Sequence, residues 1–529
     1  MTKIIVDGAH LSIEMVYDVA RKNTAIQIDD NAIHKVQNSR KLLENFVDKE
    51  FPVYGVTTGY GEMVYILINK KHETELQHNL IRSHAAGVGP YFSKEESRAI
   101  LLARINSLVK GYSAVREEFI DRLVFYLNND IIPVIPQIGS LGASGDLAPL
   151  SHLAITLIGE GFVFGKDGSP EKTKKILNQF GITPLDLKFK EGLATINGTS
   201  AMTGIGSLLV YDAFIQVQTA EIISAIALES QRASSSPFAA VGHDLAKPHQ
   251  GQVDSACNIR TLLQGSHLIA DHKSLCNDLL TQKIESVTPT TVYLQKAYTL
   301  RCIPQILGAI RDTLYHVKKV LITELNSAND NPLFFNNEEI FHGGNFHGQP
   351  VAFAMDFLSI AITQVGVLSE RRTNRLLNKH LNNGLSDFLI KNNPGLCCGL
   401  AGAQYPATAL VAENRLASTP ASIQSIPSNA DNQDVVSMGL LSARNTQKII
   451  NNTWYILAVE LISIVQAIDI AENKSLLSNQ GKVVYELVRS FVPLLDQDRC
   501  MSEDINKVAT LLQTGKLVEA LRNSGIDLI

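Results

Sequence analysis

The stretch PVAFAMDFLSIAITQVGVLSERRTNRLL, residues 350–377, is apolar on nearly every face of the helix that its periodicity predicts. A helix of this kind is buried on all sides, so we expect it at the centre of a bundle. Three further long runs have a helical period, at 206–232, 304–325 and 446–472. Helices this long, with few strand signals, are typical of a mostly α protein built as a long helical bundle.

The first 200 residues differ from this bundle because loops and short elements interrupt their helical patterns. Shorter helices are expected at 71–86, 93–110 and 114–128, and small hairpins at 159–170 and 332–344. The composition changes near 195–205. We therefore predict a smaller, loop-rich N-terminal domain at 1–200 and a long-helix bundle domain at 201–529.

Composition excludes several classes of protein. The chain has 529 residues, of which 45% are hydrophobic and 19% charged, so it can bury a large core and is not a disordered chain. Its net charge of −5 implies no basic domain that grips nucleic acid. The apolar run at 454–470 is interrupted by Glu460, Gln466 and Asp469, which favours a buried helix over a membrane span. We expect neither nucleic acid nor a membrane as a partner.

The start of the chain has no long apolar run, so we expect no secretory signal. Six cysteines are scattered without a CxxC motif, which favours a reduced, cytoplasmic enzyme. His342 and His347 are five residues apart, and that spacing matches no recognised zinc signature. We expect hydrogen-bonded structural histidines there and no metal, although a metalloenzyme that uses this pair remains an alternative.

The segment GSLGASGDLAPLSH, residues 139–152, carries the strongest chemical signal. Its glycines and prolines exclude a helix interior, and a loop this apolar is expected to be buried and functional. A sharply bent backbone brings the amide nitrogen of Gly145 towards the carbonyl carbon of Ala143, and only glycine leaves that approach unhindered. Loss of two waters, one with the Ser144 hydroxyl, would leave a methylidene on a five-membered ring. Such a group is an electrophile, which ordinary side chains do not supply.

This segment resembles the signature of the aromatic amino acid ammonia-lyases and aminomutases, which carry an autocatalytic 4-methylideneimidazole-5-one (MIO) group. The resemblance extends from about residue 10 to residue 510. Other matching motifs are YGVTTGYGE (54–62), NGTS (197–200), AYTLRCIPQ (297–305), ELNSANDNPL (324–333), HGGNFHGQP (342–350) and NQDVVSM (432–438). The resemblance implies a phenylalanine-lyase-like helical fold, no metal, and a homotetramer whose active sites are each built by three chains.

The resemblance also implies roles for individual residues. Ala143, Ser144 and Gly145 correspond to the triad that forms MIO. Tyr60 corresponds to the base that takes a β-proton, and a site that lowers its pKa would suit that role. The remaining positions are Asn197, which supports the cofactor, Tyr298 near the substrate amine, Arg301 at the substrate carboxylate, and the pocket residues Gln295, Asn326, Phe346 and Gln433.

The choice of substrate depends on two motifs. Ser83-His84 lies at the family's ring-selecting position, where histidine can hydrogen-bond a phenol; histidine-type enzymes also carry Ser-His there. Histidine ammonia-lyases resemble NQEDHVSM in this motif and have a glutamate that faces the substrate imidazole. In NQDVVSM of this chain, Gln433 stands in place of that glutamate, so histidine is disfavoured as the substrate. A buried polar group also discriminates strongly for a hydroxyl. We therefore expect tyrosine, with histidine ammonia-lyase and phenylalanine ammonia-lyase as alternatives.

The reaction outcome stays open at this point. Elimination of ammonia from L-tyrosine gives 4-coumarate, and re-addition at the β-carbon gives β-tyrosine. Several segments resemble bacterial tyrosine 2,3-aminomutases of natural-product biosynthesis, but no single residue decides between lyase and mutase. Retention of the unsaturated acid and ammonia behind a closed lid is the physical difference between mutase and lyase, and 62–80 is the candidate segment for part of that lid. A binding or scaffold bundle without catalytic chemistry is the remaining alternative.

Overall fold

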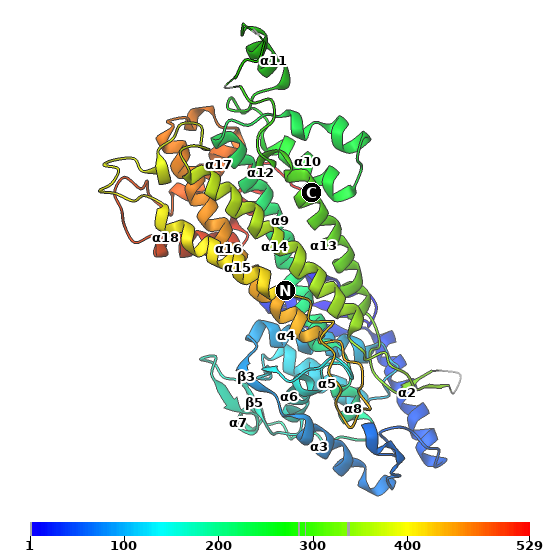
Figure 1. Cartoon of the computed structure of the whole chain (residues 1–529). Helices are drawn as coiled ribbons and strands as arrows, with labels where there is room; N and C mark the ends of the chain where they lie inside the picture. The colour runs from blue at the N-terminus through cyan, green and yellow to red at the C-terminus, as the bar shows by residue number, and fades with distance from the viewer. Residues whose placement is uncertain (1–2, 284–285, 291, 336–338) are drawn as a thin grey trace. The chain divides into compact units, whose positions relative to one another are not determined.

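The structure is a computed structural model that describes residues 3–283, 286–290, 292–335 and 339–529, and α-helices dominate it (Figure 1). The chain divides into two compact units. The first comprises Met1–Tyr211, His316–Asp356 and Pro420–Asn445, and the second comprises Asp212–Tyr315, Phe357–Thr419 and Thr446–Ile529. Our expected division at residue 200 stays a prediction of the sequence.

Four long helices confirm the predicted bundle. They are α9 (Ser200–Ser230), α13 (Ile303–Leu325), α14 (Gln349–Leu377) and α16 (Gly439–Ile470). Three of them, α9, α14 and α16, are long and apolar enough to cross a membrane, judged by length and composition. However, 72–83% of the apolar window of each is buried inside the protein. Their apolar faces are therefore used in packing, as expected for bundle helices.

Shorter helices make up the rest of both units. The first unit contains α1 (Ile13–Arg21), α2 (Asp30–Asp48), α3 (Glu73–His84), α4 (Lys94–Val109), α5 (Glu117–Asn128), α6 (Leu147–Leu157), α7 (Thr173–Gln179) and α8 (Glu191–Ile196). The second unit contains α10 (Gln250–Leu262), α11 (His272–Leu280), α12 (Tyr298–Arg301), α15 (Ala401–Ala417), α17 (Asn479–Arg489), α18 (Met501–Gln513) and α19 (Lys516–Asn523). The predicted helices near 71–86, 93–110 and 114–128 are confirmed as α3, α4 and α5.

The strands are short and pair only two at a time in the described residues. The pairs are β1 (Ile4–Val6) with β2 (Ile26–Ile28), β3 (Val88–Tyr91) with β4 (Pro136–Ile138), β5 (Phe162–Phe164) with β6 (Pro170–Lys172), and β7 (Leu333–Phe334) with β8 (Ile340–Phe341). The first pair is parallel and the others are antiparallel. The last two pairs confirm the predicted hairpins.

Local capping explains where the helices of the first unit begin. The Ser12 side chain accepts a hydrogen bond from the Met15 amide at 3.2 Å, as the N-cap of α1. Before α4, Ser93 and Glu96 form a capping box, in which each side chain accepts from the other residue's backbone. These bonds satisfy amides that a helix N-terminus otherwise leaves unpaired.

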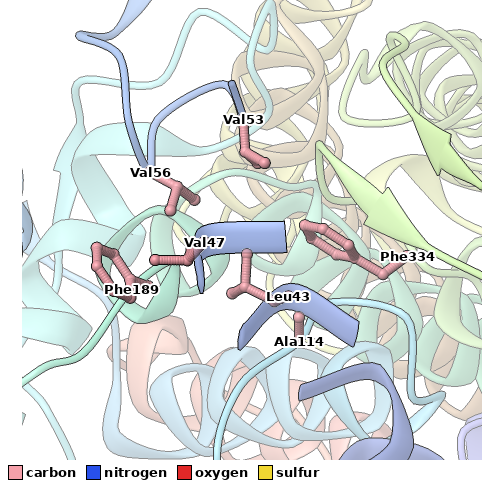
Figure 2. Packing of buried hydrophobic residues seen from close by; sticks show 7 residues of the cluster. All are labelled: Leu43, Val47, Val53, Val56, Ala114, Phe189 and Phe334. Carbon is pink, nitrogen blue, oxygen red and sulfur yellow. The ribbon is translucent and has the colours of Figure 1, made fainter. Parts of the chain in front are cut away.

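A hydrophobic cluster in the first unit anchors the segment that leads to Tyr60 (Figure 2). Val53 and Val56, just before that tyrosine, are at most 1% exposed. The cluster draws its members from α2, the 53–56 loop, the segment between α4 and α5, the approach to α8, and β7. It consists of Leu43, Val47, Val53, Val56, Ala114, Phe189 and Phe334. Burial of these side chains fixes a loop that has little regular structure of its own.

Buried ion pairs join the long helices within the second unit. Arg372 on α14 and Glu460 on α16 are each 1% exposed at the side chain, and their Nε and Oε1 atoms are 2.5 Å apart. Arg311 on α13 binds Glu221 on α9 in the same bidentate way, at 2.7 and 2.8 Å. A buried pair adds little net stability, but it makes a helix register costly to change, because either charge left alone would be uncompensated.

We expect Arg372→Met to destabilise the second unit by about 3–5 kcal/mol, because Glu460 would be left charged and buried without its partner. The double variant Arg372→Met/Glu460→Leu should recover most of that loss. The control is Arg522→Met: Arg522 pairs with Asp527 in an exposed pair, so its loss should change stability by less than about 1 kcal/mol. Thermal unfolding midpoints of the variants measure the effect, and equal midpoints for the two single variants would contradict it.

Candidate active site

The loop that carries Ala143, Ser144 and Gly145 accepts hydrogen bonds from two other segments of the first unit. The Gly142 carbonyl accepts hydrogen bonds from the Gly348 amide at 3.0 Å and from the Ser437 hydroxyl at 2.9 Å. The Leu141 carbonyl accepts from the Met438 amide at 2.8 Å. The loop is therefore fixed by the segments that lead into α14 and α16, as the buried functional loop predicted from the sequence requires.

Gly145 makes the closest approach in this loop. It pairs with Gly198 in a parallel bridge, and the next residue, Asp146, donates its amide to the Gly198 carbonyl at 2.7 Å. Gly145 has a φ of +69°, and a Cβ atom at this position would collide with the Gly198 backbone. Only glycine combines this left-handed conformation with this contact. The structure thus shows a left-handed backbone at residue 145, while the approach of its amide to the Ala143 carbonyl stays a prediction.

Asp146 locks the end of the loop against the start of α9. Its carboxylate accepts from the amides of Ala201 and Met202, both at 2.9 Å, and from the Ser140 hydroxyl at 2.8 Å. Burial raises the pKa of Asp146 to about 6, against the lowering effect of these hydrogen bonds. The positive end of a helix favours a carboxylate, so this contact ties the loop to the N-terminus of α9.

Ser144 opens onto a pocket of about 740 Å³ that lies within the first unit. Its walls come from the Tyr60 loop, α3, the 143–147 loop, α8 and the segments 346–347 and 429–435. Seven of the site residues predicted from the sequence line it together: Tyr60, His84, Ala143, Ser144, Asn197, Phe346 and Gln433. A concave site in which reactive and polar groups converge is a candidate active site.

Tyr60 lies at the start of a short 3₁₀ helix, Gly61–Tyr65, and packs edge-on against Tyr54 with ring centroids 6.4 Å apart. Its hydroxyl oxygen accepts a hydrogen bond from Gln77 Nε2 at 2.8 Å. Burial raises the pKa of Tyr60 well above its usual value, while the Gln77 bond acts in the lowering direction. The expectation that the site lowers this pKa is therefore wrong for the single chain.

Asn197 is the C-cap residue of α8, and its side-chain oxygen, Oδ1, is buried. Its Nδ2 donates to the Asn331 carbonyl at 3.3 Å, and its backbone carbonyl accepts from Arg104 Nη1 at 3.2 Å. Among the described residues, its buried Oδ1 atom has no hydrogen-bond partner. A buried polar atom without a partner costs free energy, so its persistence at a pocket wall suggests a ligand or prosthetic group there.

The two residues that the sequence predicts to select the substrate, His84 and Gln433, lie on different segments of the pocket wall. His84 Nδ1 is 2.9 Å from the Leu80 carbonyl. Nδ1 also lies 3.0 Å from the Ser83 hydroxyl. In the tautomer with its proton on Nδ1, the ring donates to the carbonyl, and Nε2 is left as an acceptor. Gln433 Nε2 donates to the Ser144 hydroxyl at 3.1 Å, and its Oε1 accepts from Ser428 at 3.2 Å.

Four predicted site residues lie away from this pocket. Asn326 binds Leu11 and Ile322 through Nδ2 and accepts from Leu11 and Asn106 through Oδ1, so its amide is fully used inside the first unit. Its contact with substrate stays a prediction. The other three, Gln295, Tyr298 and Arg301, belong to the second unit.

Those three residues form a cluster of their own. Arg301 Nη1 donates to Gln295 Oε1 at 2.5 Å, and the guanidinium lies 4.6 Å from the centre of the Tyr298 ring. Tyr298 is 68% exposed. Among the described residues, the buried Nε of Arg301 has no partner. The cluster thus offers a cation and an exposed phenol that the contacts of this chain do not fully use.

Sequence analysis missed several residues of the pocket. Leu76, Asn79 and Leu80 continue the face of α3 that carries His84, and their helical spacing from that residue was a usable signal. Asn331 lies in the same ELNSANDNPL motif as Asn326. Gln77 contacts Tyr60 from within the protein core, and nothing in its local sequence indicated that contact.

A second pocket, of about 710 Å³, lies in the second unit between α15, α16 and α18 and contains none of the predicted site residues. Within the part of the chain that the structure describes, no three His, Cys, Asp or Glu side chains gather as metal ligands do.

Known proteins share both this sequence and this architecture. The family model for aromatic amino acid lyases matches residues 11–490. The chain is 56% identical to the MIO-dependent tyrosine 2,3-aminomutase of Streptomyces globisporus and 55% identical to the tyrosine ammonia-lyase of Cupriavidus metallidurans, in each case over 99% of this chain and 98% of the relative. A crystal structure of the tyrosine aminomutase from S. globisporus superimposes with a TM-score of 0.98 at 54% identity, over the full length of both chains. The chain belongs to the aromatic amino acid lyase family, whose members include ammonia-lyases and aminomutases.

Proposed function

We propose that this enzyme acts on L-tyrosine, eliminating ammonia to give 4-coumarate and, as a 2,3-aminomutase, returning it to the β-carbon to give β-tyrosine. The observation that carries the substrate is His84. In the tautomer that donates its Nδ1 proton to the Leu80 carbonyl, Nε2 is an acceptor for a donor such as a phenol hydroxyl. The names of two relatives at 55–56% identity agree with tyrosine.

We further propose that Ala143, Ser144 and Gly145 form MIO. The residues present fit this group in two respects: Gly145 has a left-handed backbone packed against Gly198 where no Cβ fits, and the buried Oδ1 of Asn197 has no other partner among the described residues. When formed, the group supplies an electrophile for the substrate amine, which no ordinary side chain offers. The printed name of one relative, MIO-dependent, supports the assignment.

The side chains of this pocket have separable roles in the proposal. Tyr60 takes the β-proton, and Asn197 donates its second Nδ2 hydrogen to negative charge at the triad. Gln433 donates to the Ser144 hydroxyl at 3.1 Å and so orients Ser144 before that hydroxyl leaves as water. Because burial disfavours the Tyr60 phenolate, the base form needs positive charge nearby. The substrate ammonium is one such charge, and an arginine at the substrate carboxylate is another.

We propose that Arg301, Tyr298 and Gln295 serve a pocket in another copy of the chain, as in a homotetramer with shared active sites. Tyr298 is largely exposed, and among the described residues the buried Nε of Arg301 has no partner, so both side chains can still contact a ligand or a partner. A guanidinium binds a carboxylate in a bidentate fork. We also infer a cytoplasmic enzyme of natural-product biosynthesis; its six free cysteines agree with a reducing compartment.

The substrate is tested by incubating the enzyme separately with tyrosine, phenylalanine and histidine, with chromatographic separation and mass analysis of the products. We expect 4-coumarate, β-tyrosine or both from tyrosine, at the highest kcat/KM of the three. Preferential formation of urocanate from histidine would overturn the substrate and restore the histidine ammonia-lyase alternative.

Ser144→Ala should remove the electrophile and leave the helical fold intact. We expect the intact mass of the wild type to be two water molecules below that of its sequence, and the variant to show no such deficit. Turnover should fall by roughly 10³–10⁴-fold, which corresponds to about 5 kcal/mol of barrier. A variant that turns over at the wild-type rate would exclude the cofactor.

Tyr60→Phe should keep the mass deficit and the unfolding midpoint but lower kcat by about 10²–10⁴-fold, because the general base is lost. Stability should change by no more than about 1 kcal/mol, since Gln77 Nε2 retains the Gly55 carbonyl, 3.3 Å away, as an acceptor. A normal rate of β-proton exchange in deuterated water would show that another residue is the base.

His84→Phe should shift preference from tyrosine towards phenylalanine. The phenol would lose an acceptor worth about 0.5–1.5 kcal/mol, and the new ring adds apolar contact, so the ratio of kcat/KM for tyrosine over phenylalanine should fall about tenfold. In the wild type, 4-methoxyphenylalanine, which has no donor on the ring, should be a poorer substrate than tyrosine. An unchanged ratio in the variant would remove His84 from substrate recognition.

A further inference from the structure

Gln77 connects the catalytic tyrosine to the helix that carries Asn197. It lies on α3 and is 0% exposed. Its Oε1 accepts from the amides of Gly192 and Leu193, at 2.9 and 3.2 Å, in the first turn of α8. Its Nε2 donates to the Tyr60 hydroxyl oxygen at 2.8 Å and lies 3.3 Å from the Gly55 carbonyl. Every hydrogen-bonding position that faces these neighbours is used.

The two backbone amides fix which way the Gln77 side chain faces. If the amide were flipped, its NH₂ group would meet the N–H groups of Gly192 and Leu193, and both buried donors would lose their acceptor. The carboxamide nitrogen is thereby held against Tyr60. The Tyr60 oxygen must accept on this side, so its own proton points elsewhere, and a phenolate would keep the same donor after the proton leaves.

We propose that Gln77 is a positioning residue for Tyr60, which presents the tyrosine oxygen as an acceptor and stabilises its deprotonated form through a donor that cannot turn away. The inference rests on the proposed role of Tyr60 as the base. It goes beyond that role because it assigns the activation of the base to a buried amide on α3, oriented by the backbone of α8.

Few other groups compete for this function near Tyr60. Tyr54, from the same loop, acts in the opposite direction and disfavours the phenolate. The further titratable side chains that line the pocket are His84 on α3, His347 and Asp434. On α8, Glu191 is engaged by Arg116 at 2.8 Å. The hydrogen bond from Gln77 favours loss of the Tyr60 proton.

Two substitutions separate this role from a purely structural one. Gln77→Glu keeps an acceptor for the Gly192 and Leu193 amides but puts a carboxylate against Tyr60. Of the new carboxyl group and the Tyr60 phenol, the carboxyl group loses its proton first, so Tyr60 keeps its hydroxyl proton. Gln77→Met removes the acceptor as well as the donor. A structural glutamine would make Gln77→Met the more damaging change in both stability and rate, whereas a positioning glutamine makes Gln77→Glu the more damaging in rate.

The experiment measures kcat/KM for tyrosine against pH in both variants, with unfolding midpoints and the mass deficit as further readouts. In the wild type, kcat/KM falls at low pH as the base is protonated. We expect this low-pH limb to move to higher pH by about one unit or more in Gln77→Glu, so that kcat/KM at pH values on the limb falls about tenfold. In Gln77→Met the limb should move by less. The unfolding midpoint should fall more in Gln77→Met. If the buried charge prevents folding of Gln77→Glu, the limb shift in Gln77→Met decides.

Two controls complete the test. Gln137→Glu removes a comparable donor, to the Tyr91 carbonyl at 3.1 Å, outside the pocket, and should leave the pH profile unchanged. In a Tyr60→Phe background, Gln77→Glu should add less than a twofold further loss, because its effect passes through the tyrosine. An unmoved limb in both Gln77 variants would overturn the inference, as would a full additional loss in the Tyr60→Phe background. Failure of the proposed function is distinct: the wild type would then not convert tyrosine.

Discussion

The close approach of Gly145 to Gly198 is the constraint on which the site depends. Two backbone segments from different parts of the first unit meet where no side chain fits, and the Asp146 amide completes the contact with the Gly198 carbonyl at 2.7 Å. This contact holds the 143–145 loop in its bent, left-handed form and sets Asn197 beside it. A backbone that is held under such constraint at a pocket wall is typical of functional sites.

A network of buried polar side chains holds the 197–199 segment in place. Arg104, which is 0% exposed, donates to the Asn197 carbonyl and to Asn329 Oδ1, both at 3.2 Å, and burial lowers its pKa to about 10. Asn329 in turn donates to the Thr199 hydroxyl at 2.8 Å, and Thr199 binds Glu324. Replacing such a network by apolar side chains costs little stability in general, so we regard it as a device for position.

In this pocket the Tyr60 hydroxyl keeps its proton, so its action as a base depends on positive charge that other groups bring. Burial and the neighbouring Tyr54 raise the pKa of Tyr60, and the Gln77 donor acts in the lowering direction. A base that becomes active when a cationic substrate and a carboxylate-binding arginine arrive would abstract a proton only in the complete site. That arrangement fits the proposal that the Arg301 cluster completes the pocket of another copy.

The sequence by itself determined the long helices, the hairpins, the irregular 139–152 loop and the motif residues, because periodicity, capping and glycine content are local properties. The tertiary structure alone decided which motif residues share one pocket: His84, Ser144 and Gln433 do, while the amide of Asn326 is used up in packing. It also reversed the expected direction of the Tyr60 pKa and revealed Gln77. Burial and hydrogen-bond satisfaction depend on neighbours distant in the chain, and no local pattern encodes them.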